Sequence, residues 1–141
     1  VYRVHWHIQD KGAGKPIDDA EAGTLQYGLL AGAGLGDVAT GTSISASESS
    51  FSMVNNLLIS SGQFFGPRSM VANASTTPNM ITDGVFPSDE VPYVIVRDNA
   101  CILYAVGDNM TNESIISCRL EVAQVSLDQA TLNQLLRTQT V

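Results

Sequence analysis

The chain has 141 residues, a length that suits one domain with a single substantial core, and we place that domain at residues 1–141. Its 14 acidic residues outnumber 7 Lys and Arg, which gives a net charge of −7 with no basic cluster. This balance argues against binding to a nucleic-acid backbone or to anionic lipid, since both require clustered cations. No apolar run approaches the roughly 20 residues of a membrane helix, so the sequence predicts no transmembrane segment.

The first predicted strand covers residues 1–8, where apolar and polar side chains alternate as on a strand with one wet face. The apolar positions are Tyr2, Val4, Trp6 and Ile8, and the polar face carries Arg3, His5 and His7. Residues 16–22 place three acids after a proline and predict the start of a helix. Residues 25–30 predict a strand, with a short helix as the alternative.

The middle of the chain is less regular. Residues 51–60 fit either a helix, with Phe51, Val54 and Leu58 on one face, or a strand around residues 57–59. Asp83 and Gly84 predict a tight turn between the apolar pairs at residues 80–81 and 85–86.

Three apolar runs follow, at residues 91–97, 101–106 and 114–125, and polar breaks separate them. Their composition predicts strands joined by hairpins. The first two runs are apolar on both faces, so we expect them to lie centrally or to be covered on both sides. In the third run the predicted buried face holds Ile116, Cys118, Leu120 and Val122, and the exposed face holds Ser117, Arg119 and Glu121.

The two cysteines fall on adjacent strands of this predicted hairpin. If Ala105 opposes Ser114, then Cys101 and Cys118 face each other and can form a disulfide. A shift of one residue places them on different faces. The alternative is a pair of buried free thiols that pack as small apolar side chains.

After residue 125 the hydrophobic period changes to that of a helix. Ser126 with Gln129 three residues later forms a capping box, and Leu132, Leu135 and Leu136 supply an apolar face. The elements together predict a mainly β fold, an antiparallel β-sandwich that is jelly-roll-like, with a short C-terminal helix.

Two groups of residues have the composition of a metal site. His5 and His7 share one face of a strand and could bridge a metal, although outward histidines on an edge strand are the structural alternative. The loop from Asp108 to Glu113 presents closely spaced oxygen ligands suited to calcium, yet hairpin loops favour the same residues. Because neither group has a further ligand or a defined motif, we predict no metal or cofactor site.

No catalytic constellation stands out either. The sequence lacks a Gly-x-Ser-x-Gly elbow, and its glycines do not have the spacing of a phosphate-binding loop. Adjacent carboxylates occur at Asp18 with Asp19 and at Asp89 with Glu90, but neighbours on an extended chain point to opposite sides. We therefore predict no catalytic residues and a protein that is not an enzyme.

The low charge points instead to contacts with other subunits. Charged residues make up 15% of the chain, against roughly 25% in typical globular domains. Within residues 25–50 the only charged side chains are Asp37 and Glu48, and Gly, Ala, Ser and Thr predominate. Small residues permit close packing, so we predict that part of this segment lies in an intersubunit contact.

Residues 94–100, followed by residues 102–105 and 116–122, loosely resemble the closing strands of jelly-roll and related β-sandwich virion proteins. The resemblance implies a viral capsid or virion-surface (decoration) subunit that assembles with copies of itself and with other virion proteins. It also implies a location in the virion or outside the cell. The chain lacks the basic tail of a shell that packs directly on a genome, so its charge better fits a decoration subunit, or a coat whose inner face meets something other than naked nucleic acid.

The alternative is a secreted binding module, such as a carbohydrate-binding β-sandwich. Sugar sites require exposed aromatic rings as stacking platforms. The candidates in this sequence are Tyr2, Trp6, Tyr27 and Tyr93, with no cluster of Trp.

Overall fold

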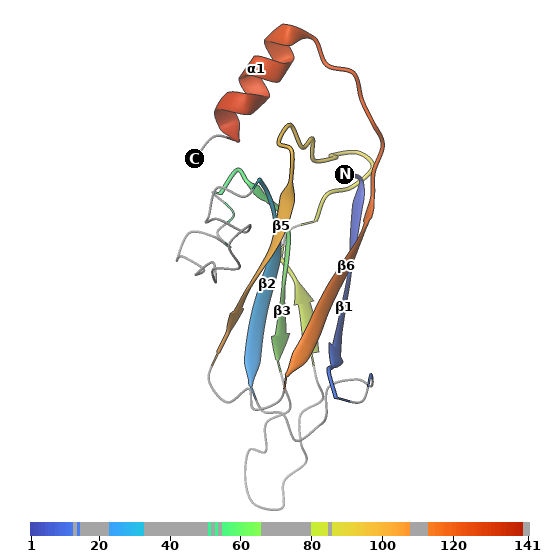
Figure 1. Cartoon of the computed structure of the whole chain (residues 1–141), viewed down its shortest axis with the longest axis vertical. Helices are drawn as coiled ribbons and strands as arrows, with labels where there is room; N and C mark the ends of the chain where they lie inside the picture. The colour runs from blue at the N-terminus through green and yellow to red at the C-terminus, as the bar shows by residue number, and fades with distance from the viewer. Residues whose placement is uncertain are drawn as a thin grey trace, which may run out of the picture.

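The computed structural model describes residues 1–12, 14, 23–32, 51, 53, 55–65, 80–84, 86–107 and 113–139. It is mainly β, as the sequence predicts, with two antiparallel sheets and one short helix (Figure 1). The strands are β1 (Arg3–Asp10), β2 (Thr24–Ala31), β3 (Leu58–Phe65), β4 (Met80–Asp83), β5 (Ala100–Val106) and β6 (Ser114–Glu121), and the helix is α1 (Gln129–Thr138).

The sheets differ in width. β1 and β6 form a two-stranded sheet, and the other sheet has four strands in the order β4-β3-β2-β5. The pairs are nested along the chain, because the first strand pairs with the last, the second with the fifth, and the third with the fourth. Pairing of β2 with β3 then joins the two inner pairs into one sheet.

Alternation of apolar and polar residues determines which side of β1 is buried. Val4 is buried and Trp6 and Ile8 are partly buried, whereas Arg3, His5 and His7 are exposed, as predicted. β6 alternates in the same way, so Ile116, Cys118 and Leu120 face the interior. Val122 lies beyond the end of β6 and is exposed, so the prediction that it is buried is wrong.

The main core lies between the two sheets. Val4 from β1 packs with Leu29 and Ala31 from β2 and Ile59 from β3. A second cluster joins Leu25, Tyr27 and Phe64 to Trp6, Ile8 and Ile116. The Trp6 Nε1–H donates to Ser60 Oγ at 2.9 Å, and the ring centroid of Trp6 lies 4.7 Å from that of Tyr27.

β2 is one of the two inner strands of the wider sheet and is covered on both faces. Its outer face packs Leu30 with Leu58 and Leu103, against which Phe51 and Cys101 also lie. Residues 25–30 therefore form a strand, and the helical alternative is wrong. Residues 25–31 are buried in their own chain except for Gln26, which is partly exposed, and residues 33–50 of the predicted intersubunit contact lie outside the described residues.

Residues 91–97 are not a strand, although their composition predicts one. Their backbone groups bond to other partners: Tyr93 exchanges hydrogen bonds with Val1, at 2.9 and 2.7 Å. The side chain of Gln139 accepts from Val96 N–H at 3.2 Å and donates to the Val94 carbonyl at 2.6 Å. Because the buried Gln139 side chain bonds to these backbone groups, they do not need a neighbouring strand as a hydrogen-bond partner.

The predicted hairpin between residues 101–106 and 114–125 is also wrong. β5 pairs with β2, and β6 pairs with β1 in the other sheet. Cys101 therefore packs on the outer face of the wider sheet, while Cys118 packs between the sheets, and both thiols are free. The disulfide alternative fails because a β-sheet separates the two side chains.

The ambiguous middle region is a turn followed by a strand. The described residues from Phe51 to Leu57 are not helical, and β3 begins at Leu58. Asp83, predicted to lie in a tight turn, is the last residue of β4, and Gly84 N–H donates to the Ser61 carbonyl, beside β3. β4 pairs with β3, and residues 86–88 are not a strand, so the structure shows no hairpin across the predicted turn.

The C-terminal helix is confirmed, but it begins later than predicted. Asp128, not Ser126, is the N-cap, and its Oδ1 accepts from Thr131 N–H at 2.8 Å. The helix holds no buried residue, and Gln139, just after it, is buried against residues 94–97. α1 therefore lies beyond the ends of the sheets and is tethered through its C-terminal end (Figure 1).

Replacing Asp128 with alanine should lower the helical signal in far-UV circular dichroism at neutral pH, while Ser126→Ala should leave it unchanged. The hydrogen bonds with Thr131 lower the pKa of Asp128, so its capping contribution is complete above the ordinary pKa of a carboxyl group. It should be lost as the pH falls through the lowered value. Asp128→Asn caps without a charge and should remove this acid dependence. Equal helical loss in the two alanine variants would contradict the cap.

Candidate functional site

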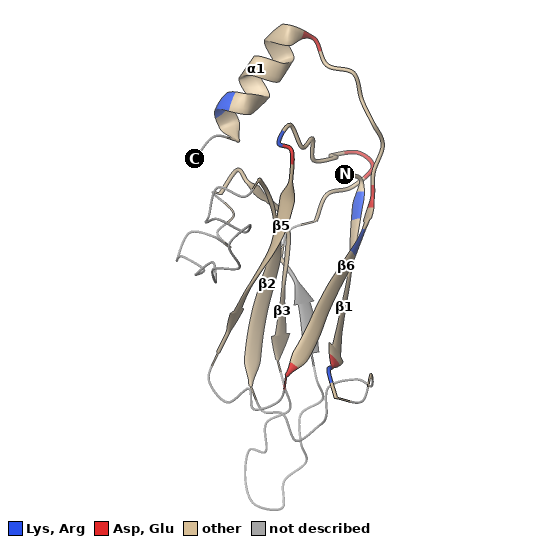
Figure 2. Ribbon diagram, viewed as in Figure 1, with Lys and Arg blue, Asp and Glu red and all other residues tan. Residues whose placement is uncertain are grey.

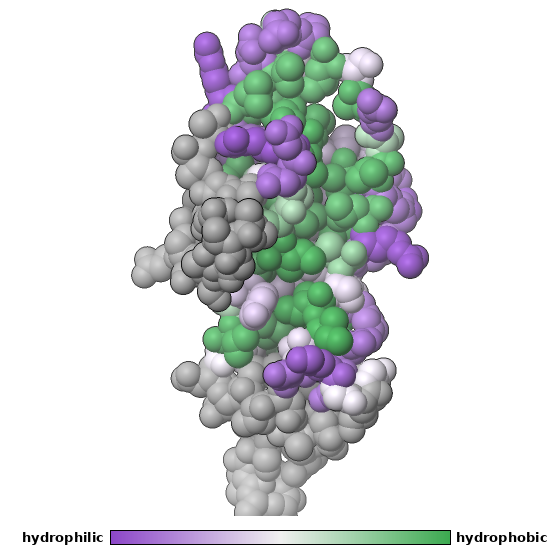
Figure 3. Space-filling model, viewed as in Figure 1, coloured by the Kyte–Doolittle hydropathy of each residue, from purple (hydrophilic) through white to green (hydrophobic). Residues whose placement is uncertain are grey.

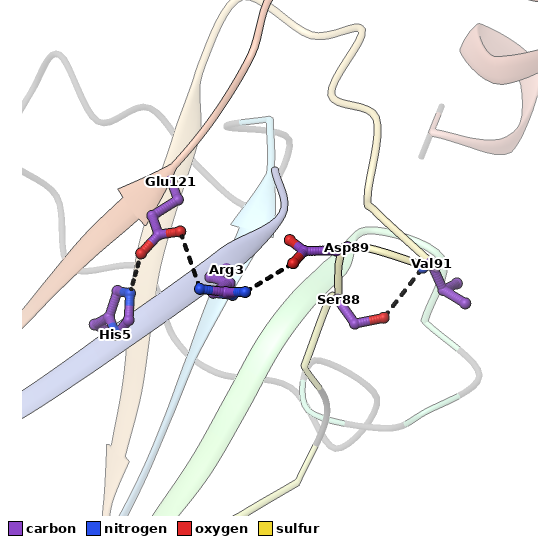
Figure 4. Close-up of polar contacts among 6 residues, drawn as sticks. All are labelled: Arg3, His5, Ser88, Asp89, Val91 and Glu121. Carbon is purple, nitrogen blue, oxygen red and sulfur yellow. Dashed lines mark hydrogen bonds and ion pairs between the residues drawn. The ribbon is translucent and has the colours of Figure 1, made fainter.

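The charged residues of β1 and β6 form a surface network rather than a metal site (Figure 4). His5 Nε2 lies 2.8 Å from Glu121 Oε1, and Arg3 contacts Asp89 at 2.7 Å and Glu121 at 3.7 Å. All four side chains are about half exposed, so solvent screens the pairs. His7 contacts Gln9 instead of sharing a ligand with His5. Among the residues that the structure describes, no group of three His, Cys, Asp or Glu could hold a metal ion.

The other residues that the sequence offered as metal ligands, acids or nucleophiles make structural contacts, as far as the structure describes them. Of the proposed calcium loop only Glu113 is described, and it pairs with Lys11. Asp18 and Asp19 lie outside the described residues, and Asp89 is paired with Arg3. Burial raises the pKa of both Cys101 and Cys118, which lowers the fraction of reactive thiolate at neutral pH.

The aromatic residues that could stack on a sugar are mostly used inside the fold. Tyr27 is fully buried, and Trp6 is partly buried against it. The Tyr93 hydroxyl donates to the Asn56 carbonyl at 2.6 Å, and burial raises the pKa of that hydroxyl. These rings hold the core and its edges together, so they do not form a platform for a carbohydrate.

One apolar face of β5 is exposed to solvent. Ile102, Tyr104 and Val106 pair in register with Leu29, Tyr27 and Leu25, and therefore project from the same side of the sheet as these core residues. Their β2 partners are buried, yet Ile102 is 41% exposed, Tyr104 59% and Val106 53%. The sequence prediction that this run is covered on both faces is therefore wrong for the single chain.

The unequal width of the two sheets explains this exposure. β1 lies toward β3, because Trp6 bonds to Ser60, and β6 lies on the other side of β1, toward β5. Within the described residues the narrower sheet has two strands, and it ends before it covers β5. A groove of about 540 Å³ remains between the two edges, lined by Ile102, Tyr104, Val106, Ser114, Ile116, Lys11 and Glu113.

The groove lies on an apolar and almost uncharged part of the surface. β2, β3 and β5 contain no Lys, Arg, Asp or Glu, and the charged residues gather at strand ends and in the connections beyond them (Figure 2). Hydrophobic surface runs down the middle of the same view, in the region of β5 and β6 (Figure 3). At the groove itself only Lys11 and Glu113 are charged, and they pair with each other. We call the set Ile102, Tyr104, Val106 and Ile116 the apolar groove.

Comparison of the chain with protein-family models, with characterised proteins and with solved structures finds no match. No helix in the described part of the chain has the length and apolar character needed to cross a membrane.

Proposed function

We propose that this protein is a structural subunit that assembles with copies of itself, and that the assembly is a viral capsid or a virion-surface layer. The observation that carries the proposal is the exposed inner face of β5. Three apolar side chains point to the side on which the core lies, yet their own chain leaves them open to water. Monomeric soluble domains rarely expose contiguous apolar surface of this kind without a partner for it.

The pairing order of the strands supports the virion part of the proposal. Nested pairs, first with last and then inward, are the arrangement expected for the jelly-roll-like sandwich that the sequence predicts. One departure from that pattern is plain: β3 and β4 join the sheet of β2 and β5, whereas in a jelly roll successive pairs alternate between the sheets. We therefore propose a shortened relative of that architecture.

The net charge of the subunit bears on which of its surfaces contact a partner. The net charge of −7, with no basic cluster, favours contacts with protein over contacts with nucleic acid. Copies with the same net charge repel one another, so they meet best through surface that carries none. The proposed role is structural and non-catalytic, in the virion or outside the cell.

Analytical ultracentrifugation over a dilution series, combined with negative-stain electron microscopy, tests this function. We expect a ring, shell or other closed oligomer that persists when NaCl rises from about 0.1 to 1 M, because salt screens charge pairs but does not weaken apolar burial. A monomer at every protein concentration would overturn the proposal. Assembly that dissolves in high salt would show that charge pairs, and not the apolar face, hold the subunits together.

A further inference from the structure

We infer that the apolar groove accepts one extended strand from a second copy of this chain, which adds to the free edge of β6 and covers β5. The inference rests on the proposed function and specifies how the subunits join. It follows from four features of the groove: an unpaired edge, an apolar floor, the space of one strand, and an absence of net charge.

The edge is the outer side of β6. Lys11 N–H donates to the Glu113 carbonyl at 3.0 Å, which sets the phase of the antiparallel ladder. In such a ladder alternate residues point both backbone groups at the partner strand, so the even-numbered residues of β6 point theirs away from β1. Among the described residues no strand pairs with that edge. The backbone groups of Ile116 and Cys118 are therefore placed to bond to an added strand.

The outer edge of β1 differs from this edge. Residues 86–90 run beside it and line a second groove with Arg3, Val4 and His5. Arg3 binds Asp89, and the segment continues to Tyr93, which bonds to Val1. In the described part of the chain, residues 86–90 therefore lie beside one edge of the two-stranded sheet, whereas no strand pairs with the edge nearer β5.

The floor and the space suit a single strand. Neighbouring strands lie about 4.8 Å apart, so we infer that a strand added to the outer edge of β6 would lie over β5, in the groove of about 540 Å³. Alternate side chains of that strand would face Ile102, Tyr104 and Val106, whose spacing along β5 has the same period of two. β5, which forms the floor of the groove, carries no charged side chain, and on β6 the charged residues Arg119 and Glu121 lie on the exposed face, away from that floor.

The geometry selects an extended segment over a simple edge-to-edge dimer. If the β6 strands of two copies paired across a two-fold axis, each would carry its own wider sheet into the space of the other copy's β5. If the β5 strands paired instead, the two β6 edges would stay several strand widths apart and the apolar groove would stay open. Only a segment free of its own underlying sheet fits between β6 and β5.

The low charge of this chain makes a second copy the donor that we propose. Since Lys11 and Glu113 satisfy each other, the groove offers no charge to bind, and a strand with few ionisable side chains complements it best. This chain is poor in charge throughout, at 15% of residues. Pairing by backbone hydrogen bonds, with pockets for alternate side chains, is a general mode of strand addition.

Tyr104→Glu tests the inference by placing a carboxylate in the groove at a side chain that is already 59% exposed, so the monomer should still fold. The matched control is Ser117→Glu, which adds the same charge to the exposed face of β6. We expect Tyr104→Glu to raise the concentration for half-assembly by about a hundredfold or more, and Ser117→Glu to change it by less than about threefold. Circular dichroism of the monomers should be identical.

Hydrogen exchange then distinguishes strand addition from other contacts. The amides of Ile116 and Cys118 should exchange at least about tenfold more slowly in the assembled wild type than in the monomeric Tyr104→Glu variant. Assembly that persists in Tyr104→Glu, or unchanged exchange at these two amides, would overturn strand addition while leaving the proposed function standing. A wild-type chain that stays monomeric would overturn both.

Discussion

Replacing Leu30 with alanine is expected to lower the free energy of unfolding by about 2–5 kcal/mol, as large-to-small changes in cores do. Leu30 is 0% exposed and packs with Leu58 and Leu103 on the outer face of the wider sheet. The truncation removes the buried contacts of Leu30 with Leu58 and Leu103 and leaves a cavity in this cluster. Urea denaturation followed by circular dichroism measures the change.

Val122→Ala is the control for that experiment. Val122 is also a large aliphatic residue, but it lies just after β6 and is 62% exposed. Its truncation should change the free energy of unfolding by less than about 0.5 kcal/mol. Similar losses at both positions would mean that Leu30 is not in a packed core and that the outer cluster is wrong.

A methyl group added at Gly62 is expected to destabilise the fold by about 1–3 kcal/mol or more, through overpacking. An added Cβ would lie 2.6 Å from the Tyr27 hydroxyl oxygen and 2.7 Å from the adjacent ring carbon. Tyr27 cannot move aside easily, because it is fully buried and its ring packs on Trp6. Either the ring or the pairing of β2 with β3 must shift.

Gly12→Ala is the matched control, because an added Cβ there meets only the partly exposed Asp10 side chain, at 3.3 Å. Gly62→Ala should therefore unfold at a clearly lower temperature than Gly12→Ala. A second substitution, Tyr27→Leu, shortens the side chain that Gly62→Ala meets, so the two changes together should cost less than their sum. If the changes in unfolding free energy of the two variants simply add, the Tyr27 ring does not clash with a side chain at position 62.

Local pattern in the sequence determined the elements whose exposure follows a simple period. Period-two alternation identified β1 and the buried face of β6 because one side of each strand faces water. The change of period after residue 125 identified α1. The N-cap was misplaced by two residues, because Ser126 and Asp128 are both good caps and only the backbone geometry selects between them.

Only the tertiary structure decided which strands pair and which faces stay open. β6 pairs with β1, more than 100 residues away, because the apolar sides of both strands pack on the same core cluster. Residues 91–97 have the composition of a strand, yet Val1 and Gln139 take their backbone hydrogen bonds. The apolar groove could not be predicted either, since β5 reads as a buried strand. Its exposure comes from the width of a sheet formed by residues far from it in the chain.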